Sequence, residues 1–182
     1  LSALVLAFKD EESTEETYDI FPFFWMPAPT IEKRLKKDKR IRYDIWVKNG
    51  FIKTTPGPVT DYAFIRQFIL DEILGKYELA QIWYDPAEAT QLAIELEEAT
   101  GNEEFMVKCL QYAKNLHEAT VMVEKLATSK NLRHGDDPIL RWMNSNVQIR
   151  TDSEGHIKID KAKSSQKVDG MTALVNAFKG WI

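Results

Sequence analysis

Cysteine is almost absent from this chain of 182 residues, and its scarcity excludes one class of protein at once. Cys109 is the single cysteine, so the chain has no disulfide framework, and a reducing compartment is expected. Cys109 lies in an apolar stretch, which favours an inert core residue over a nucleophile. Histidine is also scarce, with three residues, and neither His117 nor His156 has a partner at the spacing typical of metal ligands.

Long apolar runs and phosphate loops are missing as well. No stretch approaches the ~20 apolar residues that span a membrane, and Leu1–Phe8 has neither the charged lead nor the cleavage pattern of a signal peptide. No G-x-x-x-x-G-K-[ST] sequence occurs, which excludes an ATPase site of that type. Hydrophobic residues make up 44% and charged residues 29% of the chain, as in ordinary globular proteins. We expect one domain, residues 1–182, without membrane contact.

The net charge of −4 argues against binding of polyanions by the whole surface, but the basic residues are unevenly distributed. Residues 33–42 hold seven of the 24 lysines and arginines. This basic segment includes Lys33, Lys36, Lys37 and Lys39, which are candidates for contacts with DNA. A charge run is more often simply a solvated helix face, so both interpretations stay open.

Apolar runs that alternate with helical patterns predict a mixed α/β fold. Leu1–Phe8 and Tyr18–Met26 read as antiparallel strands, and Pro22 within the second indicates an edge position or a bulge. A strand as apolar as Leu1–Phe8 should have a neighbour on each side. We expect a third strand, Leu79–Tyr84, to share their sheet, with helices on its faces.

Asp85 directly follows the third of these strands, in the sequence Y-D-P. Open α/β sheets bind ligands at the carboxyl ends of their strands, which makes Asp85 a candidate site residue. Pro86 suits the first turn of a following helix, because the N–H that proline lacks would be unpaired there. The alternative is that Asp85 only caps this helix, as aspartate often does.

A second acidic residue, Asp169, lies at the predicted start of the last helix, in K-V-D-G-M-T-A-L. Its charge alone would favour a helix N-terminus. Gly170 adds to the interest, because glycine early in a helix lowers stability but permits close approach of backbone or ligand. Lys163 and Lys167, just upstream, could contact phosphate or be solvated.

Carboxylates from distant parts of the chain are what a hard cation requires. Mg²⁺ and Mn²⁺ prefer oxygen ligands, and a pair of such ions can hydrolyse a phosphodiester. If Asp85 and Asp169 share such a site, we expect their carboxylates to lie roughly 4–8 Å apart.

Six segments resemble one family, in order and across nearly the whole chain: the C-terminal nuclease domain of the large terminase subunit of tailed bacteriophages. They are F-F-W-M-P (23–27), Y-D-I-W-V-K-N-G-F-I (43–52), T-P-G-P-V-T-D-Y-A-F-I (55–65), Y-D-P-A-E-A-T-Q-L (84–92), L-R-H-G-D-D-P-I-L-R-W-M-N-S-N-V (132–147) and K-V-D-G-M-T-A-L (167–174).

The resemblance implies a ribonuclease H-like fold and a two-metal endonuclease that cuts concatemeric double-stranded phage DNA during packaging. It makes Asp85 and Asp169 catalytic ligands of two Mg²⁺ or Mn²⁺ ions. It also implies an earlier strand, upstream of residue 1, that carries a third aspartate. The implied partners are DNA, an ATPase motor domain, the portal and the small terminase subunit, in the host bacterial cytoplasm.

Two other functions stay open beside this one. The first is a non-catalytic module of the same fold, which would bind DNA or a packaging partner through the basic segment. The second is a different ribonuclease H-like enzyme, such as a recombinase or an RNA-cleaving hydrolase. Dependence on divalent cations separates the enzyme from the module, and substrate choice separates the two enzymes.

Overall fold

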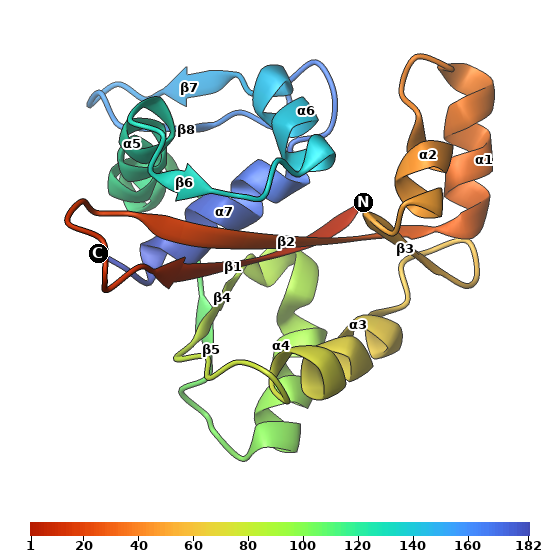
Figure 1. The fold of residues 1–182 in the computed structure, drawn as a ribbon, viewed down its shortest axis with the longest axis horizontal. Coiled ribbons are helices and arrows are strands. Elements are labelled where there is room, and N and C mark those ends of the chain that lie inside the picture. The colour runs from red at the N-terminus through yellow and green to blue at the C-terminus, as the bar shows by residue number, and fades with distance from the viewer.

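Two long antiparallel strands run across the molecule in the computed structural model, which describes residues 1–182 (Figure 1). They are β1 (Ser2–Lys9) and β2 (Tyr18–Pro27), paired from Ser2 opposite Trp25 to Lys9 opposite Tyr18. On the other side of β2, β3 (Ile52–Thr55) and β6 (Leu132–Arg133) pair with it in parallel. The result is a mixed four-stranded sheet in which β1 is an edge strand.

Pro22 occupies a gap in the pairing of β2. On the side of β2 that faces away from β1, β3 pairs with Phe24–Pro27 and β6 pairs only with Tyr18 and Asp19. The intervening residues of β2 therefore have no partner on that side. A residue without an N–H group is tolerated where a strand edge is unpaired. The predicted edge position is therefore correct locally, although β2 as a whole lies inside the sheet.

Helices cover both faces of this sheet, with α5, α6 and α7 on one side and α3 and α4 on the other (Figure 1). Successive side chains of β2 point to opposite faces of the sheet, as they do along any strand. Phe24 packs in one apolar cluster with Met143 and Phe178, and Trp25 packs in the other with Leu96. The helices are α1 (Ala28–Lys37), α2 (Tyr43–Lys48), α3 (Tyr62–Phe68) with the π-helical turn η1 (Ile69–Ile73), α4 (Pro86–Thr100), α5 (Ala113–Thr128), α6 (Pro138–Asn146) and α7 (Asp169–Lys179).

The prediction that the third strand joins the sheet of the first two is wrong. β4 (Ile82–Tyr84) pairs in parallel with β5 (Met106–Lys108), and these strands form a sheet of their own. α7 packs against both β1 and β4, but the two strands are not hydrogen-bonded to each other, because a cavity separates their facing edges. A hairpin of β7 (Ile149–Thr151) and β8 (Ile157–Ile159) completes the fold.

The arrangement is nevertheless the mixed α/β fold that the alternation of patterns predicts. Its helices are too short or too polar to cross a bilayer, so the structure contains no membrane-spanning helix.

Candidate functional site

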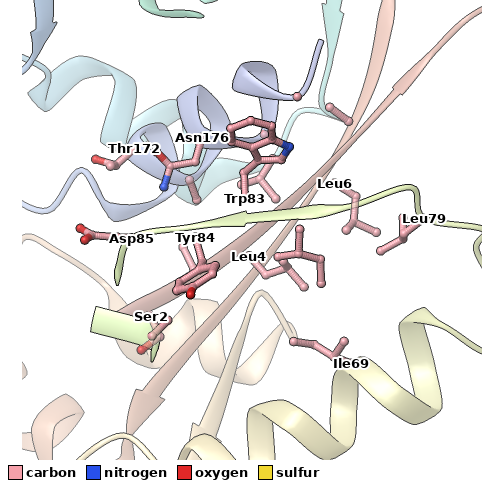
Figure 2. A pocket seen from close by; sticks show the side chains of 18 of the residues that line it. Ser2, Leu4, Leu6, Ile69, Leu79, Trp83, Tyr84, Asp85, Thr172 and Asn176 are labelled. Carbon is pink, nitrogen blue, oxygen red and sulfur yellow. The ribbon is translucent and has the colours of Figure 1, made fainter. Parts of the chain in front are cut away.

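The cavity between β1 and β4 has a volume of about 780 Å³. Its sides are the unpaired edges of the two strands, and it is closed above by Thr172, Asn176 and neighbouring small residues of α7 and below by apolar residues of α3, η1 and α4. In Figure 2, Ser2 and Asp85 lie at one end, whereas Leu6 and Leu79 lie at the other. The two strands therefore run along the cavity in opposite directions.

Asp85 reaches the cavity from the carboxyl end of β4, as predicted. It also caps α4: its Oδ1 accepts a hydrogen bond from the backbone N–H of Ala87 at 3.0 Å, and Pro86 begins the helix. The other carboxylate oxygen, Oδ2, lies 3.9 Å from Nζ of Lys161, and the side chain is 17% exposed. The two interpretations of Asp85 are compatible, because capping uses only one of its oxygens.

Asp169 enters the same cavity from the first turn of α7. Its Oδ2 is buried and has no hydrogen-bond partner. Gly170 sets the position of this turn: a Cβ atom there would lie 2.8 Å from Cε1 of Phe24 and 3.0 Å from Sδ of Met143. The backbone N–H of Gly170 donates to that sulfur at 3.1 Å. The predicted close approach of the backbone at Gly170 is thus confirmed, with a core side chain as the neighbour.

The structure brings Asp85 and Asp169 to one cavity, although they lie 84 positions apart in the sequence. The donor chemistry fits a hard cation, because both groups are carboxylates and Asp169 keeps a buried oxygen without a partner. No third histidine, cysteine, aspartate or glutamate joins them at metal-binding distance. The separation of roughly 4–8 Å expected for ligands of shared ions stays a prediction.

Basic groups border the two carboxylates. Lys161 and Lys167 line the cavity, whereas Lys163 is exposed outside it. The sequence analysis named Lys163 and Lys167 but missed Lys161, the lysine closest to Asp85, because a polar connector gives no signal of which side chain turns inward.

The lysines of the basic segment lie apart from the cavity. Lys33, Lys36, Lys37 and Lys39 are exposed on and after α1, and none of them lines the cavity. The segment's two exposed arginines, Arg40 and Arg42, pair with neighbouring aspartates. Contact of these lysines with DNA stays a prediction.

Two further polar residues were not singled out from the sequence. Tyr43 is 1% exposed, yet its hydroxyl has no hydrogen-bond partner, and the buried Nε of the half-buried Arg34 also lacks one. A helical pattern could have identified Arg34 as inward-facing, because Ile31, Arg34 and Leu35 share one face of α1.

The other reactive residues have structural roles. Cys109 is fully buried, and burial raises its pKa to about 11, so the predicted inert thiol is supported. His117 accepts a hydrogen bond from the backbone N–H of Ile157 and its ring packs against His156. Asp137 caps α6 through hydrogen bonds from the backbone N–H groups of Ile139 and Leu140, as its sequence position predicts.

Comparison with known proteins identifies relatives of the whole chain. The family model described as "Terminase large subunit, endonuclease domain" matches residues 1–181. The large terminase subunit of Enterobacteria phage HK97 is 36% identical over 174 residues, which cover 96% of this chain and 33% of that protein. Protein YmfN of Escherichia coli K12 is 27% identical over 168 residues, which cover 88% of this chain and 35% of that protein.

The fold has a solved counterpart too. The crystal structure of the HK97 bacteriophage large terminase matches with a TM-score of 0.83 at 30% identity, over 98% of this chain and 39% of that chain. The match confirms the expected mixed sheet flanked by helices and is consistent with a ribonuclease H-like arrangement. The chain spans about a third of the length of the curated relatives that it matches.

Proposed function

We propose a phosphodiester-cleaving function for this chain, which belongs to the family of terminase large-subunit endonuclease domains. Its substrate is concatemeric double-stranded phage DNA, cut during genome packaging in the cytoplasm of the bacterial host. The observation that carries the proposal is the meeting of Asp85 and Asp169 in one cavity, from elements distant in sequence. Proposed partners in the longer assembly are an ATPase motor domain, the portal and the small terminase subunit.

Asp85 and Asp169 would hold two Mg²⁺ or Mn²⁺ ions. When bound, such ions supply Lewis acidity and an activated water for phosphodiester hydrolysis. The protein contributes orientation: α4 fixes one oxygen of Asp85 through the bond from Ala87, and the packing of Gly170 on Phe24 fixes the turn that carries Asp169. Lys161 and Lys167 offset part of the negative charge where the DNA backbone would approach.

A third carboxylate would complete the ligand set that the family resemblance implies. We propose that it arrives on an extended segment lying in the cavity, because the facing edges of β1 and β4 are both unpaired. A strand there could hydrogen-bond to both edges at the usual spacing of about 4.8 Å. Its end would lie beside Asp85 and Ser2 (Figure 2).

Mn²⁺ binding tests the third carboxylate directly. Residues 1–182 and a longer product of the same gene are titrated with Mn²⁺ by calorimetry. Much tighter binding by the longer product supports a ligand outside residues 1–182, and equal affinity contradicts it.

Divalent-cation dependence tests the proposed enzyme. Supercoiled plasmid is incubated with the protein in Mg²⁺, in Mn²⁺ and in EDTA, and nicking is followed on a gel. The enzyme cuts only with the cations. Binding of the plasmid without cutting in any condition would favour the non-catalytic module, and preferential cleavage of an RNA–DNA hybrid would favour a different ribonuclease H-like enzyme.

DNA contact by the basic segment is a separate proposal within this function. Charge reversal at Lys36, Lys37 and Lys39 should weaken duplex binding and flatten its salt dependence, because each phosphate contact releases counterions. The same assay covers Lys33, Lys163 and Lys167 as single variants. An unchanged salt slope would show that these lysines are only solvated.

A further inference from the structure

Three of the buried polar atoms without hydrogen-bond partners lie on α7, α2 and α1, and of these only the atom on α7 belongs to a residue that lines the cavity. They are Oδ2 of Asp169 on α7, the hydroxyl of Tyr43 on α2 and Nε of Arg34 on α1. Native proteins leave few buried polar atoms unpaired, and those that remain often mark a functional group or the site of a water or an ion. Packing connects the three residues, because Tyr43 packs edge-on against Trp142, next to Met143, whose sulfur accepts a hydrogen bond from the N–H of Gly170 beside Asp169.

The contacts among these residues are specific. The guanidinium of Arg34 lies over the ring of Tyr43, with Cζ 5.8 Å from the ring centroid. Burial raises the pKa of Tyr43, whereas the charge of Arg34 and its contact with the hydroxyl lower it, and the charge of Asp169 raises it.

Arg34 differs from every other arginine of its segment. Arg40 and Arg42 are exposed and form bidentate pairs with Asp38 and Asp44. Arg34 is half-buried, lies over an aromatic ring and has no carboxylate within ion-pair distance. Burial of an unpaired guanidinium is unfavourable unless a partner arrives, and the planar fork of arginine matches phosphate.

We propose that Arg34 binds a phosphate oxygen of the DNA strand held at Asp169, and that Tyr43 is a positioning residue that orients the guanidinium. This inference rests on the proposed function, because it takes DNA as the ligand at Asp169. The fork of Arg34 donates hydrogen bonds to the phosphate, and the anion supplies the charge partner that the guanidinium lacks. The ring of Tyr43 is itself fixed by edge-on packing against Trp46 and Trp142.

Equilibrium binding of a fluorescent DNA duplex tests the proposal without any cleavage. Anisotropy is measured in Ca²⁺ and in EDTA at several salt concentrations. Arg34→Gln should weaken binding about tenfold, since hydrogen bonds between charged groups are stronger than neutral ones. It should also reduce the salt slope by about one, the value for one phosphate contact. Arg34→Lys should keep the slope but recover only part of the affinity, because it retains the charge and loses the fork.

Arg40→Gln is the matched control, because it removes the same group from the same segment at an exposed, paired position. It should change affinity less than about twofold, as surface pairs contribute little. Tyr43→Phe keeps the ring and removes only the hydroxyl. It should weaken binding in the wild-type background but add nothing to Arg34→Gln, which a purely structural role would not produce.

The outcomes separate this inference from the proposed nuclease. Wild-type affinity and slope in Arg34→Gln, or equal losses in Arg34→Gln and Arg40→Gln, would overturn it whether or not the protein cuts DNA. Conversely, a loss confined to Arg34→Gln supports the phosphate contact even if substitution of Asp169 leaves cleavage intact. Circular dichroism melting of each variant confirms that binding is compared between folded proteins.

Discussion

Asp85 and Asp169 reach the same cavity, but the fold uses them differently. Asp85 ends a strand, caps α4 through Oδ1 and approaches Lys161 through Oδ2. Asp169 lies within the first turn of α7, and its Oδ2 is buried without a partner. One carboxylate therefore has a structural task that would justify its presence alone, whereas the other has a buried oxygen that contributes no contact to stability.

Because of this difference, Asp169 indicates a bound ligand more strongly than Asp85 does. A capping aspartate is common at helix starts and would be expected without any ligand. An unpaired buried carboxylate oxygen is unfavourable, so its retention suggests a partner such as a cation. We therefore expect substitution of either residue to reduce catalysis equally, but substitution of Asp85 to lower the stability of the fold and substitution of Asp169 to leave it unchanged or raise it.

Loss of catalysis is the largest expected effect, and it should be shared. Asp85→Asn and Asp169→Asn should each reduce Mn²⁺-dependent nicking of plasmid by at least about a thousandfold in the intact protein, because the amide keeps the shape but removes the charge that holds a dication. Initial nicking rates on gels measure it. Full activity in either variant would show that the site has been placed wrongly.

The residue after each aspartate gives the next largest contrast. Gly170→Ala should destabilise the fold by about 1–3 kcal/mol, because the new methyl group would overlap the ring of Phe24 and the sulfur of Met143. Pro86→Ala should cost less, since proline at the first helical position contributes only a preset φ angle. Urea denaturation compares the two, and equal losses would argue that the first turn of α7 is not closely packed.

Stability should respond in opposite directions to the aspartates themselves. Asp85→Ala should lower the free energy of unfolding by about 1 kcal/mol through loss of the cap, and Asp85→Asn should retain most of it, because asparagine also caps well. Asp169→Asn should leave stability unchanged or raise it without metal, because it removes the charge from a carboxylate with a buried oxygen that has no hydrogen-bond partner. Thermal unfolding in EDTA is the measurement, and destabilisation by Asp169→Asn would contradict the contrast.

The sequence identified these two residues but not their surroundings. Asp85 was identified as a candidate site residue from a strand, a proline and a helical pattern around it. Asp169 was identified from a predicted helix start followed by glycine, and all of these are local signals. The separation of β4 from the main sheet was not predictable in this way, because strand pairing depends on which edges meet in space. Arg34 and Tyr43 were missed in part for the same reason: the helical spacing of Arg34 with Ile31 and Leu35 could indicate an inward face, but the contact between Arg34 and Tyr43 is set by packing.

The smallest expected effect is a change in the pKa of a neighbouring group, which is Cys109 for Asp85 and Tyr43 for Asp169. The charge of Asp85 adds to burial in raising the pKa of Cys109 to about 11, and that of Asp169 adds to burial in raising the pKa of Tyr43. Removing a negative charge makes formation of a second anion less unfavourable. Asp85→Asn should therefore lower the pKa of Cys109 only, and Asp169→Asn that of Tyr43 only. Ultraviolet difference spectra against pH report both groups, with a Cys109→Ala variant as the reference for the thiolate and Tyr43→Phe as the reference for the phenolate.

The sign of the thiol's effect on stability follows from the same shift. The pKa of Cys109 is higher in the folded protein than its ordinary value of 9.0, so its stabilising contribution is complete below pH 9 and is lost as the pH rises towards about 11. Asp85→Asn should lower the upper limit of this pH range, because it lowers the pKa of Cys109 in the folded protein, whereas Asp169→Asn should leave the range unchanged. If both substitutions moved Cys109 equally, the two carboxylates would not occupy the distinct surroundings described here, and the opposite stability effects expected for them would lose their basis.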